Sequence, residues 1–373
     1  MTVDFYGYLF HNETVVRGVT GMKIYEMHVK GTTKLNHNIP EHKRGKILGI
    51  SDPWMIKHYK RLGVNVLQLM PIQTSSGASY WGYDPIDWFS MDEKFGTLEE
   101  LKMALSELHD AGIKVIMDVV YNHTGDYIDG VTYCDSGMSG CGWDTNPVAS
   151  LGIIHRSIDY WLRDVGVDGM RFDLASALFW EDGEFKKHGK FSQMLSGYSD
   201  KILVSESWSC KDYQFGNMPD FMLELSGDFR DKLRQGHHNI QTSPRDVLMA
   251  FCHDGKTMHD NCTYEGKYNW VNGENNRDGG DHDYSYNFGC EGETDCPDIN
   301  AARTRHKKWL TQQLYSYDNH TLWRAGDEVR QTYNGSNNAY SQYWDSPHGW
   351  IHWDQDKLEE VYSWIDETKK VKR

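Results

Sequence analysis

The sequence predicts a closed (β/α)8 barrel of the TIM type, with long loops after its strands. Short, almost continuously apolar stretches alternate about eight times with helical stretches along the 373 residues, as βαβ units of a parallel sheet do. Acidic residues also stand at the ends of four predicted strands, where the sites of such barrels lie. A doubly wound open sheet is the alternative, but no GxGxxG motif follows the first predicted strand.

The first third of the chain shows this alternation directly. Residues 1–21 are polar and irregular, so we expect an N-terminal lead and a barrel over residues 22–373. Helix signals flank the second strand, because Asp52-Pro53 can open a helix that Gly63 closes, and Thr97-Leu98-Glu99-Glu100 resembles a capping box. The predicted strands are 22–29, 64–71 and 113–120, and the predicted helices are 53–62 and 97–110.

Two long polar loops interrupt the remainder. Residues 121–148 form a short insertion after the third strand, and residues 255–297 form a second Asn- and Gly-rich loop. Loops of this length are usually functional. The other predicted strands are within 165–175 and at 202–206, 221–225, 247–252 and 319–325; the other predicted helices are 148–164, 184–198, 228–234, 298–316 and 355–367.

Composition excludes several classes of partner. The formal net charge of −15 argues against nucleic acid and anionic membranes as partners. No apolar run approaches the roughly 20 residues of a membrane span, and the first residues lack the basic and apolar regions of a signal peptide, which predicts a cytoplasmic protein. Aromatic residues make up 13% of the chain, and Trp and Tyr offer flat faces that suit sugar rings.

The seven cysteines are scattered and form no CxxC pair, which favours reduced thiols over a disulfide framework or a zinc site. A single local bridge, Cys134–Cys141 or Cys290–Cys296, is the alternative.

A short buried strand within residues 165–175 carries the strongest chemical signal. Residues two apart in a strand share a face, so Arg171 and Asp173 lie on one face and Met170 and Phe172 on the other. A cation fixed beside a carboxylate keeps it ionised, which suits a nucleophile. A structural ion pair at a strand end is the simpler interpretation of this pair taken alone.

Three further acidic residues favour a catalytic site over a structural ion pair. Asp118, Glu206 and Asp254 also fall at predicted strand ends. One such acid is commonly a turn or cap residue, but four at one barrel mouth predict a site. Glu206 follows Leu203-Val204-Ser205, an apolar setting that raises a carboxyl pKa. A carboxylate kept ionised and an acid of raised pKa are what glycosidic cleavage requires.

These residues also carry a family resemblance. Four stretches resemble the sequence regions of the α-amylase superfamily of glycoside hydrolases, in the right order: Asp118-Val119-Val120-Tyr121-Asn122-His123, Gly169-Met170-Arg171-Phe172-Asp173, Glu206-Ser207-Trp208 and Cys252-His253-Asp254. Within the superfamily the chain looks most like the isoamylase and glycogen-debranching group. The supporting stretches are Tyr25-Glu26-Met27-His28, Tyr80-Trp81-Gly82-Tyr83-Asp84-Pro85, Asn272-Gly273-Glu274-Asn275-Asn276-Arg277-Asp278-Gly279 and Asn337-Asn338-Ala339-Tyr340. The resemblance covers about residues 22–355.

The resemblance implies a role for each residue. Asp173 would be the nucleophile, Glu206 the acid/base and Asp254 the carboxylate that stabilises the transition state. The expected substrate-binding residues are Arg171, His123 and His253 around the sugar, Tyr83 stacked beneath it, Trp81 beside it, and Asp118 and Asn122 as supports. The implied activity is retaining hydrolysis of α-glucans such as glycogen or starch, at α-1,6 branch linkages, without a cofactor.

Several alternatives stay open. An α-1,4-acting amylase or a 4-α-glucanotransferase would use the same chemistry, and a non-catalytic glycan-binding protein would have lost the acids. Ser207 stands where debranching enzymes usually have proline, and the flanking β-domains of the family are expected to be missing. A metal-dependent hydrolase using Asp118, His123 and His253 lacks an HxH or HExxH spacing, so no metal is expected. The expected partner is an α-glucan; the oligomeric state is not predicted.

Overall fold

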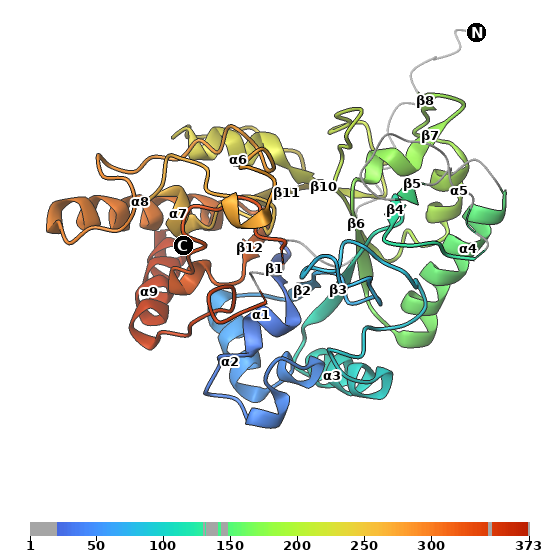
Figure 1. Ribbon diagram of the computed structural model, residues 1–373, viewed down its shortest axis with the longest axis horizontal. Coiled ribbons are helices and arrows are strands. Elements are labelled where there is room, and N and C mark those ends of the chain that lie inside the picture. Colours follow the sequence, from blue (N-terminus) through green and yellow to red (C-terminus); the bar gives the residue numbers. More distant parts are fainter. Residues whose placement is uncertain (1–20, 130, 132–140, 143–147, 342–344, 372–373) are drawn as a thin grey trace, which may run out of the picture.

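The computed structural model describes residues 21–371, apart from 130, 132–140, 143–147 and 342–344. Among these residues, eight parallel strands close into a barrel, which confirms the predicted fold class (Figure 1). The predicted lead, residues 1–21, lies outside the described residues except for Gly21. The barrel strands are β1 (Lys23–Met27), β2 (Val66–Leu69), β3 (Lys114–Val119), β6 (Gly169–Phe172), β9 (Ile202–Ser205), β10 (Leu223–Ser226), β11 (Asp246–Met249) and β12 (His320–Arg324).

The strands follow one another around the barrel in chain order, and β12 pairs with β1 to close it. The register places polar residues at the same height on neighbouring strands. Asp118 on β3 is level with Arg171 on β6, and Glu26 on β1 is level with both Gln68 on β2 and Arg324 on β12. Polar side chains from different strands therefore meet inside one end of the barrel.

Helices surround this barrel (Figure 1). In that view α2 and α3 lie below the strands, α4 and α5 to the right, α6 above, and α8 and α9 to the left. The helices are α1 (Val29–Thr33), α2 (Pro53–Leu62), α3 (Leu98–Asp110), α4 (Val148–Asp159), α5 (Lys190–Ser196), α6 (Gly227–Arg234), α7 (Met258–Asn261), α8 (Pro297–Ser316) and α9 (Gln355–Val371). A π-helical segment, Tyr160–Val165, extends α4.

The predicted helix signals act as expected at α2 and α3. The Asp52 side chain accepts a hydrogen bond from the backbone of Trp54, and Gly63 ends α2 with a φ of 81°. Thr97 accepts from the backbone of Glu100 at 3.2 Å, and Glu100 accepts from the backbone of Thr97 at 2.8 Å. This reciprocal pair is the predicted capping box.

Two predicted elements differ from the structure. The first strand ends at Met27, because His28 accepts a hydrogen bond from the backbone of Gly31 and caps α1. The helix predicted over 184–198 is only α5, since Glu184–Phe185 (β8) folds back on Trp180–Glu181 (β7) as a hairpin. The turn between them, at Asp182 and Gly183, has positive φ and lies just before the predicted helix; the pairing of Glu184 and Phe185 in β8 is what delays the start of α5.

The connections also depart from simple alternation. Residues 206–222, all described, contain no helix between β9 and β10. In the insertion at 121–148, His123–Thr124 (β4) pairs antiparallel with Cys141–Gly142 (β5). Cys290 and Cys296 are free thiols, so the bridge considered between them is absent, and Cys134 lies outside the described residues.

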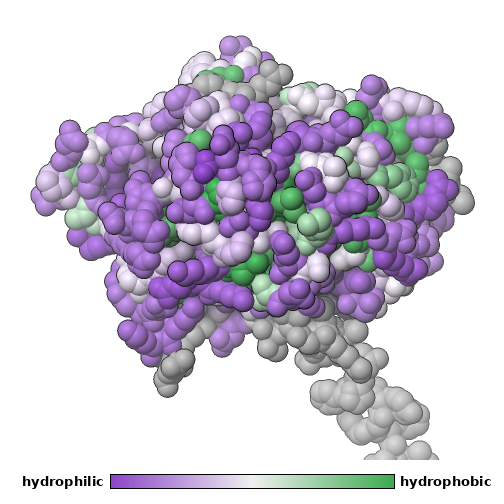
Figure 2. Space-filling view, turned by 90° about the horizontal axis from the view of Figure 1, so that it is seen from below, coloured by the Kyte–Doolittle hydropathy of each residue, from purple (hydrophilic) through white to green (hydrophobic). Residues whose placement is uncertain are grey.

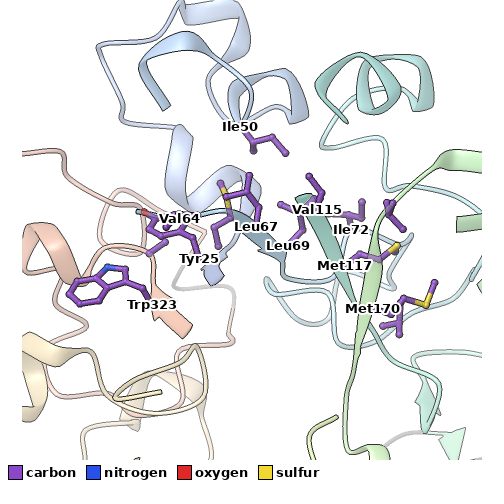
Figure 3. Packing of buried hydrophobic residues seen from close by; sticks show 14 of the residues in the cluster. Tyr25, Ile50, Val64, Leu67, Leu69, Ile72, Val115, Met117, Met170 and Trp323 are labelled. Atoms are coloured by element: carbon purple, nitrogen blue, oxygen red, sulfur yellow. The ribbon is translucent and has the colours of Figure 1, made fainter. Parts of the chain in front are cut away.

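The core has two layers, which follow from the alternation of side chains along each strand. Tyr25, Leu67, Val115, Met117 and Met170 point outward and pack beneath the helices, and Figure 3 shows them in one continuous cluster. The inward-pointing apolar residues form a second cluster inside the barrel: Met22, Ile24, Val66, Ile116, Ile202, Val204, Leu223, Leu225, Val247, Met249, Cys252 and Leu322. This inner plug closes the barrel beneath the polar end.

The face of the molecule in Figure 2 is mainly hydrophilic and carries only small, separate hydrophobic patches. Over the described residues, no helix has the length and apolar character needed to cross a membrane.

Candidate active site

The site is built from inward-pointing residues where the barrel strands end. Glu26, Gln68 and Asp118 point into the barrel, because each stands two positions after an inward residue of its strand. Arg171 is level with Asp118 and binds it, so it points inward as well. Asp173 and Glu206 follow directly after β6 and β9. The inward positions of the strands are therefore apolar in the inner core and polar at this end of the barrel.

Arg171 lies at the centre of the site. Its Nη1 donates to both carboxylate oxygens of Asp118, at 2.9 and 3.0 Å, and to Oδ1 of Asp173 at 2.9 Å. Its Nη2 lies 3.0 Å from Oε2 of Glu206. Arg171 is only 1% exposed, so one buried guanidinium binds three carboxyl groups.

Asp173 is held as a carboxylate. Burial raises its pKa, but the charges of Arg171 and His123 and hydrogen bonds from Asn122 and Arg171 outweigh burial, so its pKa lies below the ordinary value. Asn122 Nδ2 donates to Oδ2 of Asp173 at 2.9 Å and to its backbone oxygen at 2.8 Å. These contacts fix the carboxylate in both charge and orientation.

Glu206 is shifted in the opposite direction. Burial raises its pKa to about 8, against the attraction of Arg171, and the negative charges of Asp173 and Asp254 add to the shift. Its Oε2 accepts a hydrogen bond from the backbone of Leu174 at 2.7 Å. At neutral pH this carboxyl group holds a proton that it can donate.

Asp118 supports the pair from below. It is fully buried, and burial raises its pKa to about 6 although Arg171 lowers it. Tyr83 Oη donates to Asp118 Oδ2 at 2.7 Å, so the ring of Tyr83 is anchored beside the acids. The structure therefore brings Asp118, Arg171, Asp173, Glu206 and Tyr83 together as predicted.

His253 closes another side of the site. Its ring stacks on Tyr83, with centroids 5.0 Å apart, and Trp81 contacts it edge-on at 5.4 Å. Its Nδ1 lies 2.8 Å from Oε1 of Glu26, and its backbone N–H donates to Oε2 of Glu26 at 2.6 Å. Burial lowers the pKa of His253, but Glu26 outweighs burial and raises it above the ordinary value.

His123 is oriented by the protein at both ring nitrogens. Its Nε2 lies 2.6 Å from the backbone oxygen of Tyr83, and its Nδ1 contacts Oδ1 of Asn122. His123 therefore ties the Tyr83 loop to Asn122, the residue that positions Asp173.

Asp254 differs from the other acids because its side chain is exposed at the barrel mouth. Its charge still raises the pKa of Glu206, which places the two in electrostatic range. Among the described residues its carboxylate accepts no hydrogen bond, so both oxygens are available to a ligand.

Glu26 is a site residue to which sequence analysis gave no role. It is buried on β1 and binds His253 twice, and Gln68 Nε2 donates to its Oε1 at 3.3 Å. Its signal was present, since an acid at an inward position of a buried strand needs a partner. Over the described ranges, no three His, Cys, Asp or Glu side chains are grouped to hold a metal ion.

Comparisons with known proteins found similar chains and folds. Residues 23–138 match the family model described as "Alpha amylase, catalytic domain". The chain is 31% identical to a "Glycogen operon protein GlgX homolog" of Mycobacterium tuberculosis, over 88% of this chain and 54% of the relative. It is 32% identical to a "Glycogen debranching enzyme" of Klebsiella pneumoniae, over 89% of this chain and 59% of the relative. The chain thus spans between half and two thirds of the length of these curated relatives.

Solved structures show the same fold. A pullulanase from Bacillus acidopullulyticus superposes with a TM-score of 0.68 at 19% identity, over 94% of this chain and 48% of that one. A pullulanase from Anoxybacillus, complexed with maltotetraose, superposes with a TM-score of 0.67 at 20% identity, over 97% of this chain and 59% of that one.

Proposed function

We propose that the chain hydrolyses α-glucans with retention of configuration, preferentially at α-1,6 branch linkages, and the match of residues 23–138 to the catalytic domain of the α-amylase family supports this. One observation carries the proposal. A single guanidinium, that of Arg171, binds both Asp173 and Glu206, while burial and neighbouring charges move their pKa values in opposite directions. Two carboxyl groups in different protonation states are the requirement of retaining hydrolysis.

The first step uses both acids. The Asp173 carboxylate attacks the anomeric carbon and forms a covalent glycosyl–enzyme bond. Glu206 donates its proton to the glycosidic oxygen, so the departing chain leaves as a neutral alcohol. The positive charge that develops on the sugar ring is stabilised by the exposed carboxylate of Asp254, and Tyr83 offers an aromatic face beneath the ring.

The second step reverses these roles. Glu206, now a carboxylate, removes a proton from water, and the resulting oxygen attacks the anomeric carbon. The bond to Asp173 breaks, and the sugar leaves with its original configuration. We expect the two carboxyl groups to act at a separation of about 5–5.5 Å, the spacing of retaining enzymes.

Specificity for branch linkages rests on the loops at the barrel mouth. The β11–β12 loop and the segment after β12 carry the two stretches that resemble the debranching group, and they are joined directly. Asn272 Nδ2 donates to the backbone oxygen of Asn338 and to Asp278 Oδ2, both at 2.7 Å. The names of the relatives, glycogen debranching enzyme and pullulanase, support the same linkage.

Product analysis on three substrates tests the proposal. We expect maltotriose from pullulan and linear chains from glycogen, with little attack on maltoheptaose. Rapid cleavage of maltoheptaose with glycogen branches left intact would establish an α-1,4 hydrolase instead, and longer maltooligosaccharides formed from shorter ones would establish a glucanotransferase.

A further inference from the structure

An aromatic tip projects from the β11–β12 loop outside the catalytic cluster. Trp270 is 62% exposed and the adjacent Val271 is 49% exposed. Trp is a residue that proteins usually bury, so an exposed Trp–Val pair on an ordered turn indicates a contact surface. The catalytic chemistry above makes no use of this pair.

Buried asparagines hold the turn rigidly. Asn269, which precedes the 3₁₀ turn Trp270–Asn272, is completely buried. Its Nδ2 donates to Asn337 Oδ1 at 2.7 Å and to the backbone oxygen of Asp278 at 2.9 Å, and its Oδ1 accepts from Ser336 Oγ at 2.8 Å. A tip fixed in this way loses little conformational entropy when a ligand binds.

The segment after β12, which contains Ser336 and Asn337, also connects the tip to the active site. Tyr340 Oη donates to Glu274 Oε1 in the loop at 2.7 Å, and the backbone oxygen of Tyr340 accepts from the N–H of Tyr80 at 2.9 Å. Ala339 packs in one cluster with Tyr80 and Trp81. Trp81 contacts His253, so contacts through the segment after β12 link the loop that carries the tip to the catalytic cluster.

The side chains exposed on this loop can bind a neutral sugar chain. Trp270 and Val271 offer apolar surface to the C–H face of a pyranose, and the Glu274 carboxylate can accept hydrogen bonds from hydroxyl groups. The chain carries a net charge of −15, which disfavours a polyanionic occupant.

We propose that Trp270 is an outer glucan-binding platform, which stacks on a glucose unit several residues away from the bond that is cleaved. This inference rests on the proposed function, since it assigns a longer stretch of the same α-glucan to the same mouth. It predicts that Trp270 matters for long chains and little for short ones.

Calorimetric binding in an Asp173→Asn background tests the platform without turnover. We expect Trp270→Ala to weaken binding of maltoheptaose about three- to tenfold, the effect of losing one aromatic contact, and to leave maltotriose binding within about twofold. Trp270→Phe should retain most of the affinity. Met103→Ala, at an exposed apolar residue of α3, is the matched control and should change neither affinity.

The outcomes separate the two proposals. If the Asp173→Asn parent binds neither oligosaccharide, the proposed function fails and the platform fails with it. If the parent binds maltoheptaose and Trp270→Ala binds it equally well, the platform alone is refuted. A change in oligomeric state on light scattering, with unchanged glucan affinity, would also refute it and would assign the tip to a protein partner.

Discussion

Arg171 decides the charge state of the site at the scale of single residues. It is the buried cation bound to Asp118, Asp173 and Glu206, and the pKa of Asp173 stays low because of it. Burial meanwhile keeps the proton on Glu206. The division of labour between nucleophile and acid therefore follows from where each carboxyl group stands relative to one guanidinium.

Removing either acid should remove catalysis while leaving the fold intact. Glu206→Gln deletes the general acid and should lower kcat about 10²- to 10⁴-fold, and Asp173→Asn should cost at least as much because no covalent intermediate can form. Steady-state kinetics on pullulan measure this, with near-ultraviolet circular dichroism as the control for folding. Near-wild-type turnover in either variant would refute the assignment.

The pKa of Glu206 also predicts a pH profile. Activity should fall as pH rises through about 8, because Glu206 then loses the proton it must donate. On the acid side activity should persist to below the ordinary pKa of an aspartate, since the pKa of Asp173 is lowered. A kcat/KM profile whose basic limb lies near pH 5 would contradict this.

The same shift predicts a pH-dependent effect on stability. The pKa of Glu206 is higher in the folded chain than in the unfolded one, so its contribution to stability is lost as pH rises through about 8. Glu206→Gln, which cannot ionise, should therefore raise the urea midpoint more at pH 9 than at pH 5. An equal change at both pH values would show that Glu206 is not a buried, protonated acid.

Contacts between residues of one strand could be predicted from the sequence, whereas contacts between residues of different strands could not. Arg171 and Asp173 were expected to share a face because strand geometry requires it. The role of Glu26 depends on His253, 227 residues away in the chain, and no local pattern encodes that contact. The exposure of Asp254 likewise depends on how its loop folds.

At the scale of elements, the β11–β12 loop is held to the segment after β12 by asparagine side chains. Asn269→Ala would leave Asn337 and Ser336 without their buried partner, at a cost of about 1–3 kcal/mol for each unsatisfied group. We expect limited proteolysis within residues 264–288 to accelerate several-fold while the unfolding temperature of the barrel changes little. His282→Ala, at an exposed residue of the same loop, is the control. Unchanged cleavage would show that the loop is held by other contacts.

Elements were predicted well where their ends carry their own signals. The capping box at Thr97 and the Pro53–Gly63 pair marked α3 and α2 correctly. The helix predicted over 184–198 begins only at Lys190, because Glu184 and Phe185 pair with Trp180 and Glu181 across a turn at Asp182 and Gly183.

At the scale of the molecule, alternation of strands and helices was sufficient to predict a closed barrel, because parallel strands joined by helices have few other solutions. The strand count and acids at strand ends located the mouth before any contact was known. The polar lining behind the catalytic pair could not be predicted, since it needs residues from β1, β2 and β12 at one height.

Net charge gives a prediction at this scale. A neutral glucan gains nothing from electrostatic steering by a chain with a net charge of −15. We therefore expect kcat/KM on pullulan to change by less than about twofold between low and physiological ionic strength. A steep salt dependence would indicate a charged substrate.

The configuration of the first product tests the central claim most directly. Proton NMR of pullulan hydrolysis, recorded before the sugars mutarotate, resolves the α- and β-anomers of the new reducing end. If Asp173 forms a covalent intermediate that Glu206 helps to hydrolyse, the α-anomer appears first and Asp173→Asn yields no product. The β-anomer as first product would show that a single inverting displacement operates, and it would contradict the roles given to both residues.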